Sequence, residues 1–159
     1  MTDIERRPPG FQIRPARFDE PAVRELVSDA LADLARRYGG SGDDTPVAPT
    51  DFEPPNGEFL VAVAGGELIG CCGWRTHGEA AELKRMYIAP HVRGRGVARR
   101  LLAAVEESAR RLGRRRVILE TGDKQPEAVA LYRSAGYREI ANFGYYRDHP
   151  GVLSFGREL

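Results

Sequence analysis

The sequence predicts an α+β domain with a mixed, mostly antiparallel sheet flanked by helices. Three observations predict this class. Segments that alternate apolar and polar residues, as strands do, are interleaved with three segments whose apolar residues recur at helical spacing. Glycine turns join the strands in the middle of the chain into hairpins. The chain of 159 residues is 42% hydrophobic and 30% charged, and these values are typical of one globular domain.

The N-terminal part is expected to begin with a flexible leader over residues 1–10, followed by a single domain over residues 11–159. Residues 11–17 alternate apolar and polar side chains and predict the first strand. A helix follows, and Asp19 fits its N-cap position. Its apolar face is expected to consist of Val23, Leu26, Val27, Ala30, Leu31 and Leu34.

The middle of the chain combines a long irregular segment with three strands. Residues 39–58 hold the densest Gly, Pro and Asp content of the sequence. So long an irregular segment in a compact domain either covers or lines a site, or is a solvated loop. Residues 59–90 predict three strands, with one tight turn at Gly65-Gly66 and another around Gly78.

The C-terminal part predicts two helices and three strands. The first helix is expected from about Gly96 to Leu112, and an apolar strand follows over residues 116–121. Residues 126–136 predict a short helix that begins at Pro126, a favoured first position. The segments YREIANF and VLSFGREL predict a closing antiparallel pair.

Residues 91–108, HVRGRGVARRLLAAVEES, place glycines and arginines at the start of a helix, where free N–H groups and the helix dipole favour an anion. A triphosphate loop is excluded because it requires G-x-x-x-x-G-K-[ST], and no lysine lies near these glycines. A dinucleotide loop is disfavoured because Arg99 stands where a small residue is needed for close packing.

Composition argues against several other partners. The net charge is +1 and no nucleic-acid-binding motif accompanies the arginines, so we expect no nucleic-acid partner. No apolar run approaches the roughly 20 residues of a membrane span. Cys71 and Cys72 are adjacent and form neither a disulfide framework nor a metal cluster. We therefore expect a reduced, cytoplasmic protein without a metal or a membrane partner.

Two segments resemble a known family. ELKRMYIAPHVRGRGVARRLL (82–102) resembles the acetyl-CoA-binding core of the GNAT superfamily of N-acetyltransferases, whose pattern Q/R-x-x-G-x-G/A is matched by Arg93, Gly96 and Ala98. ALYRSAGYREI (130–140) is similar to the second signature of that family. The element order agrees over residues 11–159. The resemblance implies a sheet splayed between its fourth and fifth strands and acetyl-CoA as the acyl donor.

The resemblance also implies which residues bind the donor. The main chain of the fourth strand would bind pantetheine, and the N–H groups at the start of the following helix would bind the diphosphate, for which the glycines allow close approach. An amide side chain after the fifth strand would add a contact, although Gln replaces the usual Asn. The implied donor-binding residues are Met86, Tyr87, Ile88, Arg93, Gly94, Arg95, Gly96, Val97, Ala98, Arg99 and Gln125.

For catalysis, the resemblance implies Tyr132 as the general acid that protonates the leaving thiolate and Glu82 as the base that deprotonates the amine. Glu120 is the alternative base. Because side chains alternate along a strand, we expect Glu82, Lys84, Met86 and Ile88 to share one face.

The acceptor is expected to be a primary amine of a small, amino-acid-like molecule. Acids in residues 39–58 would hold its cationic group, with Tyr145 and Tyr146 lining the wall; these acids are Asp43, Asp44, Asp51 and Glu53. A protein or peptide acceptor, and a silent acyl-CoA-binding module of the same fold, remain as alternatives. A homodimer is compatible with the sequence.

Overall fold

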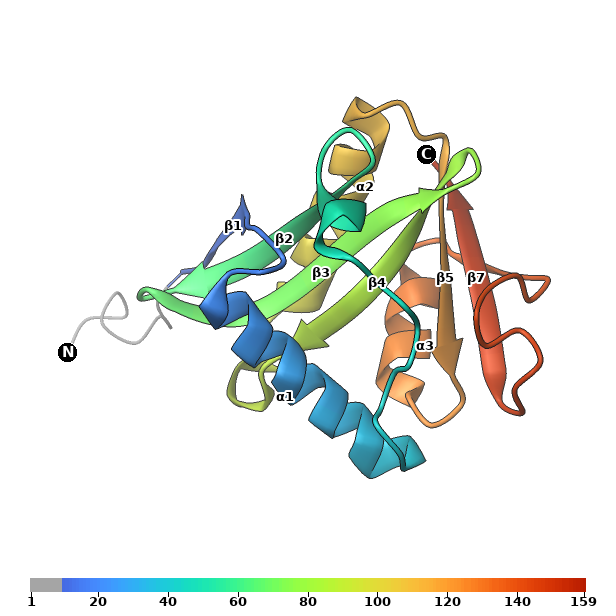
Figure 1. Ribbon diagram of the computed structural model, residues 1–159, viewed down its shortest axis with the longest axis horizontal. Helices are drawn as coiled ribbons and strands as arrows, with labels where there is room; N and C mark the ends of the chain where they lie inside the picture. Colours follow the sequence, from blue (N-terminus) through green and yellow to red (C-terminus); the bar gives the residue numbers. More distant parts are fainter. Residues whose placement is uncertain (1–9) are drawn as a thin grey trace.

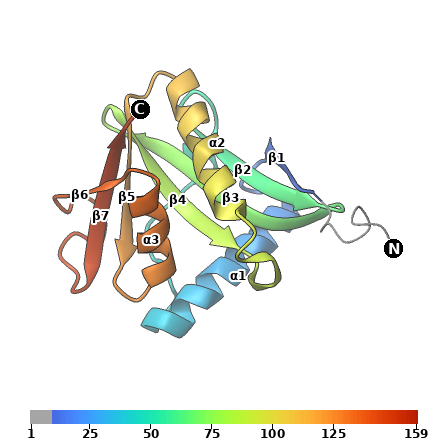
Figure 2. The ribbon, with the colours of Figure 1, turned by 180° about the vertical axis from the view of Figure 1, so that it is seen from behind.

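The computed structural model describes residues 10–159, so all of the expected leader except Gly10 lies outside the described residues. A single sheet carries helices on both faces (Figures 1 and 2). The helices are α1 (Pro21–Tyr38), α2 (Val97–Arg111) and α3 (Pro126–Ser134), with short 3-10 turns η2 (Pro49–Phe52) and η3 (Pro90–Val92). The strands are β1 (Gln12–Pro15), β2 (Gly57–Ala64), β3 (Glu67–His77), β4 (Ala80–Ile88), β5 (Arg116–Gly122), β6 (Arg138–Ile140) and β7 (Val152–Glu158).

The seven strands are arranged in the order β1-β2-β3-β4-β5-β7-β6. Every neighbouring pair is antiparallel except β4 and β5, which are parallel. The predicted fold class is therefore confirmed, as are the closing pair of strands and the hairpin turns. None of the helices in the described part of the chain is both long and apolar enough to cross a membrane.

Each face of the sheet has its own apolar core. The helix α1 and the segment that contains η2 cover one face, and α2 and α3 cover the other (Figures 1 and 2). Successive residues of β3 contribute to different cores, because Cys71 packs with α1 and η2 whereas Cys72 packs with α2. Both thiols are buried, so the cysteines pack as small apolar side chains.

The parallel pair of strands separates almost at once. The register between β4 and β5 comprises only Ala81↔Val117 and Glu82↔Ile118. Beyond Glu82 the two strands diverge, and this is the splay that the resemblance implied. A gap between the strands at the centre of the sheet is therefore the main feature that the fold offers to a ligand.

A β-bulge interrupts β4 at the start of the splay. The register with β3 shifts between Gly73↔Lys84 and Cys71↔Tyr87, and Arg85 has a positive φ of 59°, a conformation that a side chain other than glycine rarely adopts. Met86 and Ile88 consequently pack on the α2 side, while Lys84 points to the side of residues 39–56. The prediction that Glu82, Lys84, Met86 and Ile88 share one face is therefore wrong, because the bulge inverts the alternation.

The start of α1 also differs from the prediction. Glu20, not Asp19, stands at the N-cap, and no side chain caps the helix. Asp19 instead pairs with Arg17, whose Nε lies 3.0 Å from the carboxylate. Pro21 at the first helical position, whose fixed φ suits a helix and whose missing N–H needs no cap, explains the start.

Candidate active site

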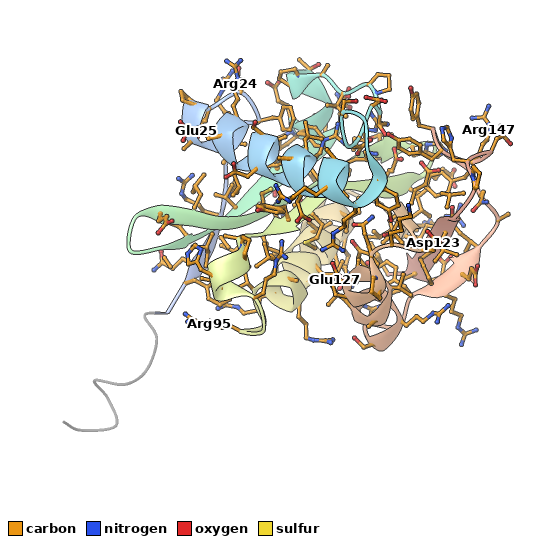
Figure 3. The ribbon with its side chains drawn as sticks, turned by 90° about the horizontal axis from the view of Figure 1, so that it is seen from below. Arg24, Glu25, Arg95, Asp123, Glu127 and Arg147 are labelled. Carbon is orange, nitrogen blue, oxygen red and sulfur yellow. The ribbon has the colours of Figure 1, made fainter. Side chains whose placement is uncertain are left out.

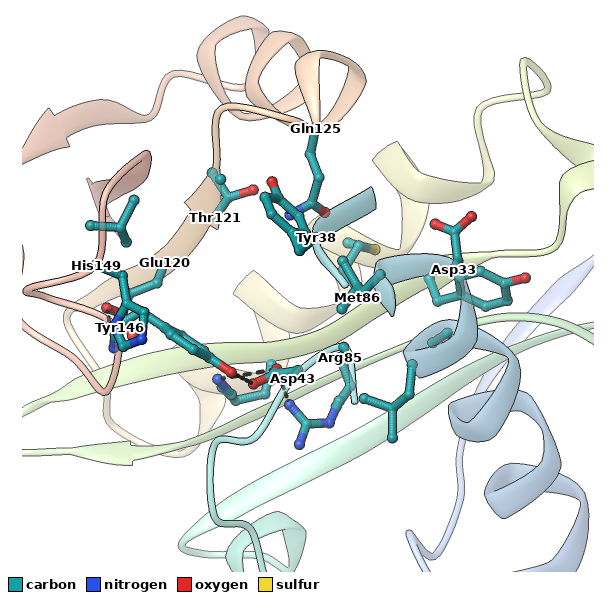
Figure 4. Close-up of a pocket in the computed structure, with 18 of the residues that line it drawn as sticks. Asp33, Tyr38, Asp43, Arg85, Met86, Glu120, Thr121, Gln125, Tyr146 and His149 are labelled. Atoms are coloured by element: carbon teal, nitrogen blue, oxygen red, sulfur yellow. Dashed lines mark hydrogen bonds and ion pairs between the residues drawn. The ribbon is translucent and has the colours of Figure 1, made fainter. Parts of the chain in front are cut away.

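A cavity of about 340 Å³ opens where β4 and β5 separate (Figure 4). Its walls come from α1, β4, β5, α3, the loop that follows α1 and the loop that precedes β7. Its polar lining residues are Asp33, Tyr38, Asp43, Lys84, Arg85, Tyr87, Glu120, Thr121, Gln125, Tyr132, Tyr146 and His149. The loop after α1 and the loop before β7 are far apart in the sequence and meet over this one cavity.

The residues predicted to bind the donor fall into two groups. Met86, Tyr87 and Gln125 line the cavity. The others lie outside the cavity lining, at the end of β4, in the loop before α2 and in the first turn of α2, and Arg95 extends from that loop (Figure 3). Gln125 lies beside α1, because its Nε2 donates to the hydroxyl of Tyr38 at 3.3 Å. The predicted donor-binding residues therefore lie in two places, one in the cavity wall and the other around the start of α2.

The loop before α2 and the first turn of that helix have the backbone conformation and the free N–H groups that an anion-binding site requires. Gly94 and Gly96 have φ values of 81° and 80°, so each needs glycine for its conformation. The first N–H of α2 that is paired within the helix is that of Arg100, which donates to the carbonyl of Gly96 at 3.1 Å. For the N–H groups of residues 94–99, the described residues provide no hydrogen-bond acceptor. Free N–H groups at a helix start form a site for an anion.

Arg93 connects the loop to β4. Its Nε donates to the carbonyl of Ile88 at 3.0 Å, and its guanidinium lies 5.7 Å from the centre of the Tyr87 ring. Arg99 is also engaged, because it donates to Ser134 of α3 at 2.7 Å. These contacts hold the start of α2 against β4 on one side and against α3 on the other.

Tyr132 projects from α3 into the cavity wall and is almost fully buried. Its ring lies 5.8 Å from that of Tyr137, and burial raises the pKa of its hydroxyl well above the ordinary range. The phenol therefore stays protonated at any physiological pH. That is the state in which a tyrosine can donate a hydrogen bond to a departing thiolate.

Glu120 lies on β5 and lines the cavity (Figure 4). Its Oε2 accepts a hydrogen bond from the N–H of Tyr146 at 3.1 Å, whereas its Oε1 is buried without a hydrogen-bond partner among the described residues. Burial raises the pKa of this carboxyl. Gly144 passes so close that any side chain there would clash with the carboxylate. A carboxylate with a free oxygen and a raised pKa has the properties of a general base.

Glu82 lies outside the cavity. Its side chain is 3% exposed, and its Oε1 accepts a hydrogen bond from Arg75 Nε at 2.9 Å. It lines a second, polar depression together with Asp51, Asn56 and His77. The structure therefore separates the two candidate bases, and Glu120 is the one that shares a cavity with Tyr132.

Asp43 is the only one of the four predicted acids that lines the cavity, and its carboxylate is already surrounded (Figure 4). Oδ1 accepts hydrogen bonds from the hydroxyls of Thr45 at 2.6 Å and Tyr146 at 2.9 Å, and Oδ2 pairs with Arg85. Burial opposes ionisation of Asp43, but Lys84, Arg85 and Thr45 outweigh it and lower its pKa. The carboxylate thus joins the loop after α1 to β4 and to the loop before β7.

The other predicted acids serve local structure. Asp44 accepts a hydrogen bond from Ser41, and Asp51 accepts one from the N–H of Ala48 at the start of η2. Glu53 lies outside the cavity lining. Of the two predicted aromatic residues, Tyr146 lines the cavity, while Tyr145 is exposed with its ring 4.9 Å from that of Tyr146.

Six polar residues of the cavity were not among the predicted site residues: Lys84, Arg85, Asp33, Tyr38, Thr121 and His149. The first two had a signal in the sequence, because a Lys-Arg pair inside an otherwise apolar strand must be matched by buried partners. No sequence signal indicated His149, which reaches the cavity through the course of its loop. Among the described residues, no cluster of three or more His, Cys, Asp or Glu could hold a metal ion.

Comparisons with known proteins agree with this geometry. The model of the Acetyltransferase (GNAT) family matches residues 27–137. IAA acetyltransferase of Azospirillum brasilense is 40% identical over 142 residues, which cover 88% of this chain and 92% of that protein.

Solved structures give the same result for the fold. A structure from Klebsiella pneumoniae matches with a TM-score of 0.78 and 28% identity, over 94% of this chain and 97% of that one. A GNAT family acetyltransferase from Elizabethkingia anophelis with acetyl-CoA bound matches with a TM-score of 0.65 and 20% identity, over 94% and 98% of the two chains. The splayed sheet, the free N–H groups before α2 and the family match lead to one conclusion: the chain belongs to the GNAT family of acetyltransferases.

Proposed function

We propose that this acetyltransferase moves the acetyl group of acetyl-CoA directly to a primary amine of a small, amino-acid-like acceptor. The observation that carries the proposal is the joint presence of Glu120 and Tyr132 in one cavity at the splay. One is suited to accept a proton from the amine and the other to donate a hydrogen bond to the leaving sulfur. A module that only bound acyl-CoA would need neither group.

The chain's own groups fit acetyl-CoA. The free N–H groups of Gly94, Arg95, Gly96, Val97, Ala98 and Arg99 suit its diphosphate, and Arg93 holds that loop against β4. Met86 and Tyr87 line the cavity at the splay, Ile88 follows them at the end of β4, and Gln125 lines the cavity at the start of α3, so pantetheine would bind between them. Acetyl-CoA supplies the activated thioester.

Glu120 is the base in this proposal, in place of Glu82. A free alkylamine has a pKa of about 10 and is protonated at neutral pH, so it must lose a proton before it attacks. Glu120 lines the cavity and its Oε1 has no hydrogen-bond partner among the described residues, whereas Glu82 is engaged with Arg75. The raised pKa of Glu120 brings its proton affinity closer to what amine deprotonation requires.

A small acceptor fits the way in which the loops cover the cavity. The hydroxyl of Tyr146 accepts a hydrogen bond from the N–H of Asp44 at 2.6 Å and donates one to Asp43. These bonds connect residues 102 or more positions apart, so the loop after α1 and the loop before β7 are held together. Two loops joined in this way over a cavity favour a small-molecule acceptor over the surface of a folded protein.

A thiol-release assay tests the proposal. Purified protein is incubated with acetyl-CoA and a panel of amino acids, polyamines, aminoglycosides, other amines and peptides, and free coenzyme A is measured. We expect release that depends on an amine and an acetylated amine as the product. Tight binding of coenzyme A without release for any amine would support the silent module, and release with peptides alone would support a peptide acceptor.

Replacing Tyr132 with phenylalanine tests the role of the hydroxyl. Loss of a hydrogen bond to a charged group costs about 1.5–3 kcal/mol, so we expect kcat to fall about 10- to 100-fold. Acetyl-CoA affinity, measured by isothermal titration calorimetry, should change little because the ring still fills the wall. A variant with full kcat would remove Tyr132 from the acid role.

A further inference from the structure

Lys84 is a buried cation in the wall of the cavity. Its side chain is 7% exposed, and its Nζ donates to the hydroxyl of Thr45 at 3.2 Å. The nearest carboxylate oxygen, Oδ2 of Asp43, lies 3.8 Å away, beyond hydrogen-bond distance. An ammonium has three N–H groups, and the described residues provide a short hydrogen bond for only one of them.

Of the nearby acids, Asp43 and Glu82 are committed to other groups, and Glu120, although close enough to feel the charge of Lys84, forms no hydrogen bond or ion pair with it. Asp43 receives hydrogen bonds from Thr45 and Tyr146 and pairs with Arg85. Glu82 pairs with Arg75. Burial lowers the pKa of Lys84, and the attraction of Asp43 and Glu82 offsets only part of that effect. Lys84 is therefore a buried charge with unused donors, a costly arrangement unless a ligand supplies an anion.

The sheet places Lys84 opposite Glu120. The last register pair of the parallel strands is Glu82↔Ile118, and Lys84 and Glu120 each stand two residues further along. Since side chains two apart share a face, both point to the same side at the first position of the splay, and both line the cavity. A base and an unmatched ammonium thus border one small space.

We infer that Lys84 binds a carboxylate of the acceptor, so that the substrate is an amino acid whose amine faces Glu120 and whose carboxylate faces Lys84. The inference rests on the proposed function and narrows its substrate class. It also reverses the sequence-based expectation that acids would hold a cationic group of the acceptor. Asp43, the one of those acids that lines the cavity, is already neutralised by Arg85. In an α-amino acid the amine and the carboxylate are one carbon apart, which suits groups that border the same space.

The test compares amino acids with their carboxamides, which have nearly the same size but lack the negative charge and carry an NH2 donor in place of one acceptor oxygen. For each pair that the wild-type protein acetylates, we measure kcat/KM with Lys84 intact and in Lys84→Met. We expect the wild type to prefer the acid about 10- to 100-fold and Lys84→Met to lose that preference, because a hydrogen bond to a charged group is removed. Lys84→Gln serves as a second variant, since a shorter neutral side chain can still bond Thr45.

Two controls make the result decisive. Lys124→Met removes the chain's other lysine, which is exposed and outside the cavity lining, and it should keep the preference of the wild type. Circular dichroism and thermal melting establish that each variant is folded. If the Lys84 variants lose the same factor on acid and amide, or if the wild type shows no preference, the carboxylate site is refuted while acetyl transfer itself stands. If the wild type acetylates no amine at all, the proposed function fails instead.

Discussion

Replacing Glu120 with glutamine is expected to lower kcat by about 100- to 10,000-fold at neutral pH, the range typical of a lost general base. The glutamine side chain has the size of the original and its amide oxygen can still accept the N–H of Tyr146, but it cannot take a proton. Steady-state kinetics with saturating acetyl-CoA measure the effect. Binding of acetyl-CoA should be retained because the free N–H groups before α2 are untouched.

The pH dependence of the rate should differ between the wild type and Glu120→Gln on its acidic side. Burial raises the pKa of Glu120, so the wild-type rate should fall as the pH drops through that raised value, and the variant should lack this limb. Glu82→Gln is the matched control, since it removes the other candidate base. If Glu82→Gln abolishes the limb and Glu120→Gln remains active, the base is Glu82.

The same shift has a consequence for stability. The unfolded chain has the ordinary, lower pKa, so the folded state holds the proton of Glu120 more tightly than the unfolded state does. This difference in proton binding stabilises the folded state at pH values below the ordinary pKa of a glutamate. The stabilisation is lost as the pH rises through the raised pKa of Glu120. At neutral pH the charged carboxylate therefore opposes folding, and Glu120→Gln should raise the Tm while it lowers activity.

Replacing Asp43 with alanine is expected to lower the free energy of unfolding by about 3–5 kcal/mol, because it leaves a buried cation without its partner. The Arg85 side chain is 5% exposed, and that of Asp43 is 15% exposed. Thr45 and Tyr146 would lose the acceptor of their hydroxyl groups as well. A native domain is stable by only about 5–15 kcal/mol, so the loss should be visible as a large shift of the urea midpoint.

Two comparison variants isolate the cause. Asp43→Asn keeps the shape and an acceptor oxygen but removes the charge, so it should fall between the wild type and the alanine variant. Asp44→Ala removes the neighbouring, exposed acid and should change stability by no more than about 0.5 kcal/mol. An Asp43→Ala variant as stable as Asp44→Ala would mean that Arg85 finds another partner.

Local patterns explain why much of the fold and the donor loop could be predicted. The hairpin glycines, the helical apolar spacing and the pattern at Arg93, Gly96 and Ala98 each act over a few neighbouring residues. The part of the cavity expected to bind the acceptor depends instead on contacts between segments that are distant in the sequence. Nothing in the sequence indicates that Asp43 meets Arg85 and Tyr146, and no local rule places a bulge within β4.

That bulge accounts for the largest error in the sequence analysis. Strict alternation placed Glu82 and Met86 on one face, and a single residue with positive φ, Arg85, separated them. Lys84 precedes the bulge and keeps the face of Glu82, and the bulge turns Arg85 to the same side, where it meets Asp43.

The short parallel contact between β4 and β5 determines what holds the two parts of the sheet together. Only two residue pairs join the four strands β1-β2-β3-β4 to the three strands β5-β7-β6, while each part is internally held by longer antiparallel ladders. The two parts are therefore held together mainly by the apolar core under α2, to which β4 and β5 both contribute, and by the contacts of Asp43 with Arg85 and Tyr146. Beyond Glu82 and Ile118 the facing edges of β4 and β5 are left without a partner strand at the place where the cavity opens, while Lys84 and Glu120 stay on strands that are paired on their other side.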